Sequence, residues 1–159
     1  MEFIHLHPIT AANGSLWIGA PTSSLCPSPI PPEDCAPGTS TAFVGGQPAL
    51  GLDVEVPGGQ AVFVQSNGQL GFTQAHVPVI PDGATLTGFS WEAIESDEGL
   101  GQLSTSSFNA TTFSACPRGD PYPYLVFARV PLLNFESCTN FDAVTVPVPG
   151  GGATAFEYI

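Results

Sequence analysis

Lysine is absent from this 159-residue sequence, and Arg118 and Arg129 are its only arginines, against fourteen Asp and Glu residues. The resulting formal net charge of −12 at pH 7 repels phosphate backbones and anionic membrane surfaces. We therefore expect neither nucleic acid nor a membrane as a partner. The lack of lysine also removes Schiff-base chemistry and a lysine grip on phosphate.

Long apolar runs are missing as well. No stretch approaches the roughly twenty apolar residues of a membrane span, and the last residues form no hydrophobic tail of the kind that signals a lipid anchor. The residues after Met1 lack the apolar core of a signal peptide, as in a secreted protein shown without its signal. We hypothesise that residues 1–3 are a start codon followed by a cloning scar.

Turn-forming residues are abundant, with 18 glycines and 17 prolines, and no window shows the apolar stripe of an amphipathic helix. Gly and Pro interrupt helices and separate short strands. We predict one all-β domain over residues 1–159, an antiparallel β-barrel or β-sandwich of about ten to twelve strands. A chain of this length is long enough to bury a core.

The clearest pattern covers residues 50–76 and predicts three consecutive strands. Leu52, Val54 and Val56 alternate with Asp53 and Glu55, as in a half-buried strand. Residues 61–64 form an apolar run typical of a central strand, and Asn67-Gly68 predicts a type I′ hairpin turn before the third strand. Further strands are expected at residues 3–7, 15–19, 41–44, 85–91, 103–113, 122–130, 137–146 and 154–159, with an exposed acidic loop at 92–102. The apolar run of 122–130 predicts a strand at the centre of a sheet.

Four cysteines allow complete pairing in three connectivities. We favour Cys26–Cys35 and Cys116–Cys138, because these pairs close short local loops, and neither spacing is that of a zinc site. The first pair would staple the proline-rich segment 20–40, a loop that cannot form a central strand because proline lacks the backbone donor.

Two glycosylation motifs agree with secretion into an oxidising compartment. They begin at Asn13, in Asn-Gly-Ser, and at Asn109, in Asn-Ala-Thr. Asn13 is expected at the tip of a hairpin, since Asn-Gly is a turn signal.

Candidate metal ligands and catalytic acids have simpler explanations. His5 and His7 share a strand face and would need His76 to form a three-histidine metal site, so ordinary surface residues are the better interpretation and no metal or cofactor is predicted. Asp53 and Glu55 could cleave a glycoside as a carboxylate pair, but a solvated strand face explains them better. The acidic loop lacks the residue pattern of an EF-hand calcium site.

Four aromatic residues are candidate sugar contacts, namely Trp17, Trp91, Tyr122 and Tyr124. Such rings stack on sugars when exposed, although aromatic side chains more often fill a core. The Pro-Tyr-Pro-Tyr run at 121–124 is the most exposed of these positions by its composition.

The sequence resembles the fungal phialide-type cell-wall proteins (PhiA), which are also described as IgE-binding or mannoprotein-like antigens. The resemblance covers nearly the whole chain and rests on these segments: IHLxPI, NG and LWIG at 4–19, SSLCP at 23–27, CAPG at 35–38, LDVEVPGGQ at 52–60, LGFTQAH at 70–76, ACP at 115–117, Cys138 and AFEYI at 155–159. It implies a secreted, glycosylated cell-wall protein of spore-bearing cells, without an established enzyme activity.

We therefore predict a non-enzymatic secreted protein of the fungal cell wall, with a structural or developmental role and wall polysaccharide or a host surface receptor as its partner. Sensing by a host, as an elicitor or an allergen, is part of this prediction. The first alternative is a carbohydrate-binding module that uses exposed aromatics. The second is a wall glycoside hydrolase that uses a carboxylate pair.

Overall fold

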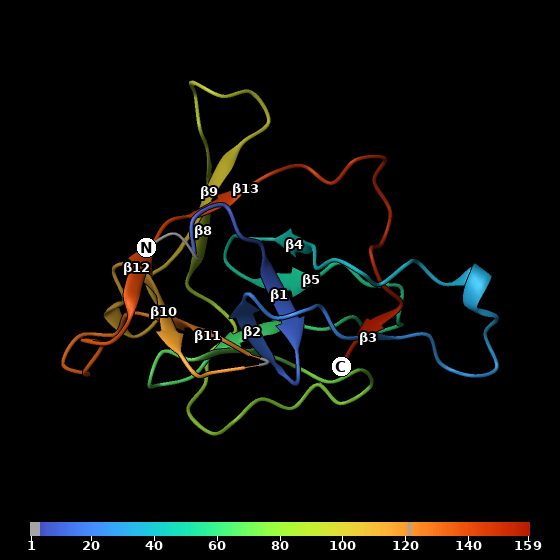
Figure 1. The fold of residues 1–159 in the computed structure, drawn as a ribbon, viewed down its shortest axis with the longest axis horizontal. Helices are drawn as coiled ribbons and strands as arrows, with labels where there is room; N and C mark the ends of the chain where they lie inside the picture. Colours follow the sequence, from blue (N-terminus) through green and yellow to red (C-terminus); the bar gives the residue numbers. More distant parts are fainter. Residues whose placement is uncertain (1–3, 121) are drawn as a thin grey trace.

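The computed structural model describes residues 4–120 and 122–159 and confirms an all-β fold with two short 3-10 turns, η1 (Pro32–Asp34) and η2 (Ser107–Asn109) (Figure 1). The largest sheet has the order β12-β10-β11-β2-β7-β6, and β1 also pairs with β2. Its strands are β1 (Ile9–Ala12), β2 (Ser15–Ile18), β6 (Val62–Val64), β7 (Leu70–Phe72), β10 (Phe113–Pro117), β11 (Tyr124–Ala128) and β12 (Thr139–Phe141).

Three smaller sheets accompany the large one. The order β13-β9-β8 forms the first, and the pairs β14-β3 and β4-β5 form the others. Their strands are β3 (Ser24–Leu25), β4 (Phe43–Gly45), β5 (Leu50–Leu52), β8 (Phe89–Ala93), β9 (Gly101–Thr105), β13 (Ala143–Thr145) and β14 (Glu157–Tyr158). All pairings between these strands are antiparallel.

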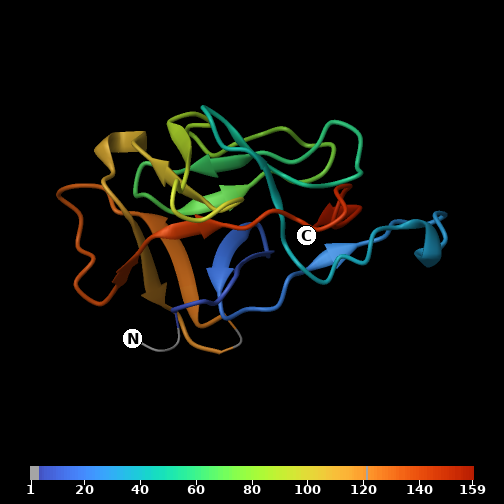
Figure 2. The same ribbon diagram turned by 90° about the horizontal axis from the view of Figure 1, so that it is seen from above.

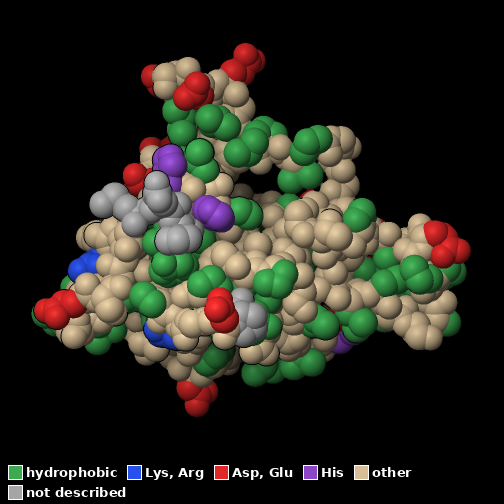
Figure 3. Space-filling model, viewed as in Figure 1, with side chains coloured by type: hydrophobic (Ala, Val, Ile, Leu, Met, Phe, Trp, Pro, Cys, Tyr) green, Lys and Arg blue, Asp and Glu red, His purple; other side chains and the backbone are tan. Residues whose placement is uncertain are grey.

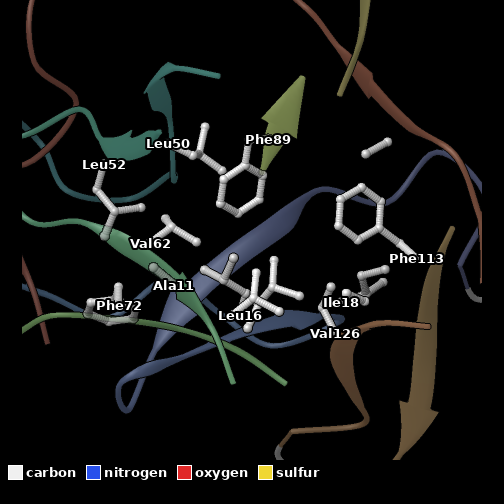
Figure 4. Close-up of a cluster of buried hydrophobic side chains, with 14 of the residues drawn as sticks. Ala11, Leu16, Ile18, Leu50, Leu52, Val62, Phe72, Phe89, Phe113 and Val126 are labelled. Carbon is white, nitrogen blue, oxygen red and sulfur yellow. The ribbon is translucent and has the colours of Figure 1, made fainter. Parts of the chain in front are cut away.

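The sheets pack as a sandwich (Figure 2), and the barrel alternative is wrong for the described residues, since the strand order of the large sheet does not close on itself. The main core lies between the layers. Figure 4 shows Phe89 and Leu50, from the smaller sheets, facing Leu16, Ile18 and Val126 of the large sheet. This interdigitation excludes water from both inner faces.

The large sheet is also covered on its outer face, and β11 shows this most clearly. Val126 and Ala128 point into the main core, whereas Leu125 and Phe127 belong to a second cluster with Trp17. A strand buried on both faces is apolar at successive positions, not at alternate ones. This confirms the prediction from residues 122–130 that this strand is central.

Two of the predicted hairpins formed, with one change of turn type. In β1–β2, Ala12 pairs with Ser15 across Asn13 and Gly14, which both have positive φ. In β6–β7 the expected type I′ turn at Asn67-Gly68 is wrong, because only Gly68 has positive φ (93°) and its N–H bonds to Gln65. This is a three-residue loop ending in a left-handed glycine.

The other differences arise where strand-like patterns bend. Residues 4–6 form a turn, with Leu6 at φ 62°, so no strand is present there, and residue 3 lies outside the described residues. The strand expected over 103–113 is interrupted by η2, where Phe108 has φ 54°. The segment 137–146 divides into β12 and β13, which join different sheets. Strand β5 pairs with β4, and its Gly51 also forms an isolated bridge with Ala61.

Two disulfides are present, Cys26–Cys35 and Cys116–Cys138, and these are the pairs that the sequence favoured. The first closes the base of the proline-rich loop, which projects from the body with η1 at its end (Figures 1 and 2). The second ties β10 to the segment before β12, next to the outer cluster.

The last strand is fixed by buried polar groups. The Gln60 side chain donates to the carbonyls of Thr73 (3.0 Å) and Tyr158 (2.9 Å) and accepts from the Tyr158 N–H (2.9 Å). The Tyr158 phenol donates to the Ser40 carbonyl at 2.8 Å and accepts from the Ala42 N–H at 3.3 Å. Burial raises the pKa of this phenol, and a hydrogen bond from Thr154 opposes that rise.

Candidate functional site

The four candidate sugar contacts do not form one platform. Trp17 is only 9% exposed, and its indole N–H donates to the Ala12 carbonyl at 2.8 Å. Tyr122 is half-buried against it, with the ring centroids 4.8 Å apart, while Tyr124 is half-buried against the main core. Only Trp91, which is 40% exposed and lies in a different sheet, offers much ring surface to a ligand.

Trp91 lies on the β8–β9 hairpin, which projects from the body beside β13 (Figure 1). Its indole lies against Gly101 of β9, since a Cβ at Gly101 would be only 2.3 to 2.4 Å from the indole ring atoms. The indole N–H donates to the Thr145 hydroxyl of β13 at 2.8 Å. Backbone on one side and this hydrogen bond at the edge hold the ring in one orientation.

Apolar residues and a glycine lie next to Trp91. It pairs with Leu103 across the hairpin, and a Cβ at Gly46 of the β4–β5 turn would lie 3.3 Å from its own Cβ. The tip of the hairpin carries acidic side chains, visible at the top of Figure 3. The arrangement is a pre-oriented aromatic face with a satisfied polar edge, which suits stacking on the apolar face of a sugar ring.

Sequence reasoning included Trp91 among the candidates but did not identify its support. The sequence placed Gly101 in an acidic loop at 92–102, and those bounds are wrong, because β8 continues to Ala93 and β9 begins at Gly101. A glycine inside a strand often marks a close approach by another group. What the pattern did not show was that the approaching group is the indole of the opposite strand.

The candidate metal ligands are dispersed. His5 and His7 are exposed in a turn and the segment after it, and His76 is exposed in a separate turn at residues 74–77. Within residues 4–120 and 122–159, no group of three or more His, Cys, Asp or Glu side chains is placed to hold a metal ion.

Asp53 and Glu55 line neither of the two hollows described below. Asp53 is half-buried where its backbone bonds to Ala42 and Thr154, and Glu55 is exposed. Two hollows lie elsewhere, one of about 450 Å³ and one of about 370 Å³, and neither is lined by Asp or Glu. These hollows therefore lack the carboxylate pair of a glycosidase.

Both glycosylation motifs are accessible. Asn13 and Asn109 are exposed and have positive φ, 51° and 63° respectively. Asn13 also lines the larger hollow, together with Tyr122. A glycan at either position would extend into solvent and not into the core.

The model of a family described as PhiA-like secreted protein matches residues 2–159. The chain belongs to this family. The resemblance noted in the sequence is thereby confirmed. A relative from Arthroderma benhamiae, named "Uncharacterized secreted protein", is 33% identical over 156 residues, which cover 95% of this chain and 77% of that protein. No solved structure matches this PhiA-like chain.

Membership of a secreted family agrees with the two disulfides of this PhiA-like protein, since such bonds persist in oxidising compartments. No helix formed by the described residues has the length and apolar character needed to cross a membrane.

Proposed function

We propose that this PhiA-like protein is a non-enzymatic component of the fungal cell wall, which it joins by stacking Trp91 on neutral wall polysaccharide. The observation that carries the proposal is the fixed indole of Trp91, 40% exposed and supported by Gly101 and Thr145. A rigid ring loses little conformational entropy when it binds. A polymer also offers many copies of the same sugar, which raises the occupancy of a single stacking site.

A structural role also suits the rest of the molecule. Two disulfides are present, and such bonds restrict the unfolded chain. The proline-rich loop is closed by Cys26–Cys35 at its base. Sensing by a host, as an elicitor or an allergen, stays a prediction that these features do not test.

The test is retention on insoluble chitin and on β-1,3-glucan particles, with the bound fraction measured against protein concentration. We expect retention of the wild-type protein on at least one of these polymers and about a tenfold loss of affinity for Trp91→Ala, whereas Trp91→Phe retains part of it. Leu132→Ala is the matched control, because Leu132 is a fully exposed apolar side chain outside the hairpin.

Soluble oligomers of the retained polymer give an independent measurement. Only two tryptophans are present, and Trp17 is buried, so a fluorescence change on binding reports Trp91. Equal retention of the wild-type protein and Trp91→Ala would refute the role of this ring, and absence of retention on both polymers would refute binding to wall polysaccharide.

A further inference from the structure

The two arginines lie on the same outer face of the large sheet, and each guanidinium covers a phenyl ring. Arg118 Cζ is 5.5 Å from the centroid of Phe127, and Arg129 Cζ is 5.4 Å from that of Phe135. The two rings meet edge to face at 5.8 Å. Figure 3 shows both basic patches on the same side of the molecule. In a chain with a net charge of −12, this face carries both of the arginine side chains.

Arg118 lines the hollow of about 370 Å³. One wall is formed by residues 133–135 and 137–138, and the other comes from β10, β11 and the β6–β7 turn. The disulfide Cys116–Cys138 joins these two walls. The hollow is therefore built from segments that are tied together, so that its shape does not depend on a free loop.

Hydrogen-bond donors remain available around this hollow. Arg118 uses Nη1 to donate to the carbonyl of Pro117 at 2.9 Å, and a guanidinium has five N–H groups. The Oδ1 atoms of Asn67 and Asn134 accept backbone N–H groups at 3.0 and 2.9 Å, which leaves their amide NH₂ groups as donors. The hydroxyl of Ser137 completes the polar lining.

Stacking on Phe127 also prepares the guanidinium for binding. The aromatic ring stabilises the guanidinium through the face of the guanidinium plane. The N–H groups at the edge of that plane therefore stay available for a planar acceptor. A carboxylate matches the guanidinium fork with two parallel hydrogen bonds. Amide donors, a hydroxyl and apolar ring edges around one such fork are complementary to a sugar that carries a carboxylate.

We propose that this hollow binds a short acidic saccharide, with the carboxylate of a uronic acid residue on Arg118 and its hydroxyl groups on Asn67, Asn134 and Ser137. Asp120 and Glu136 are exposed in the adjoining segments, and together with the net charge they disfavour a long polyanion. The site is separate from the proposed stacking surface at Trp91, so either can fail without the other.

The test measures the affinity of the intact protein for trigalacturonate by calorimetry, with neutral maltotriose and sodium acetate as comparison ligands. We expect binding of trigalacturonate that weakens as salt concentration rises, with much weaker binding of maltotriose and acetate. In NMR spectra, the side-chain NH₂ signals of Asn67 and Asn134 should shift during the titration.

Arg118→Gln and Arg129→Gln form a matched pair, because each removes one positive charge from above a phenyl ring. Arg129 does not line the hollow, and its guanidinium donates to Asn140 Oδ1 at 2.9 Å. We expect affinity to fall about tenfold or more for Arg118→Gln and by about twofold or less for Arg129→Gln.

Three outcomes overturn the proposal: no binding of trigalacturonate, equal losses in the two arginine variants, or equal affinity for acetate or maltotriose. Equal losses would mean that only overall charge matters. If Arg118→Gln does not fold, as judged by its thermal transition, Asn67→Ala and Ser137→Ala test the same hollow, and unchanged affinity in both of them also overturns it.

Discussion

Replacing Tyr158 by Phe tests how the last strand is held. The side chain is completely buried, and its hydroxyl contacts the Ser40 carbonyl at 2.8 Å and the Ala42 N–H at 3.3 Å, which are 118 and 116 residues away in the sequence. It also contacts the Thr154 hydroxyl at 2.7 Å. Phenylalanine fills nearly the same volume, so the change removes hydrogen bonds and leaves packing intact.

The expected loss follows from those contacts. A net hydrogen bond contributes about 1 kcal/mol, and a buried group left without its partner costs about 1–3 kcal/mol. Ser40 is exposed and Thr154 half-buried, so water can replace the phenol there, whereas Ala42 is buried. We expect Tyr158→Phe to lower the free energy of unfolding by about 2 kcal/mol, which corresponds to a fall of about 4–8 °C in Tm for a chain of this size.

Urea unfolding, followed by tryptophan fluorescence and by circular dichroism, measures this difference if the two transitions coincide. Tyr124→Phe is the control, since it removes a hydroxyl from a tyrosine that is half-buried. A loss below about 0.5 kcal/mol for Tyr158→Phe, or a loss equal to that of Tyr124→Phe, would show that the buried hydroxyl contacts do not hold the strand.

Three further predictions concern the pH, the disulfides and the aromatic site. Burial raises the pKa of Tyr158 above that of an unfolded tyrosine, so the folded state keeps the phenol proton to a higher pH. The free energy of unfolding should therefore fall as the pH rises above about 10. Urea unfolding over a series of pH values checks this, and the fall with pH should be smaller in Tyr158→Phe. Replacing Cys116 and Cys138 by serine should lower the free energy of unfolding by about 3.4 kcal/mol, because the disulfide closes a loop of 22 residues. Urea unfolding measures this loss, and the reasoning fails if removal of Cys26–Cys35, which closes a loop of only nine residues, lowers the free energy of unfolding by more. Gly101→Ala should displace the Trp91 indole, because the added Cβ would lie 2.3 Å from it; this predicts a changed emission spectrum and weaker retention on wall polysaccharide, and an unchanged spectrum would contradict the contact.

Local patterns predicted those parts of the fold that depend on neighbouring residues. Asn13-Gly14 sets a hairpin because two successive residues tolerate positive φ. The apolar run of β11 marks a strand buried on both faces, as both clusters show. Cys26 and Cys35 are close in sequence, so the entropic cost of bringing them together is small. The family was likewise recognisable from segments of the sequence.

Local patterns failed where contacts with distant residues change the local conformation. Residues 103–113 have the composition of a strand, but Phe108 adopts a left-handed conformation in η2. The Ser107 hydroxyl there donates to the Thr87 carbonyl at 2.7 Å, twenty residues away. Such a contact compensates for local strain, and no periodicity in the segment itself encodes it.

The candidate sites show the same division. By itself, the sequence determined an acidic, all-β, disulfide-bonded chain of a secreted family, because composition, alternation and short spacings act through neighbouring residues. Only the tertiary structure decided that Trp17 is buried while Trp91 is exposed, and that Arg118 lies over Phe127 beside a hollow. The exposure and the partners of a side chain depend on which distant strands pack around it, and strand pairing is set by the burial of the whole core.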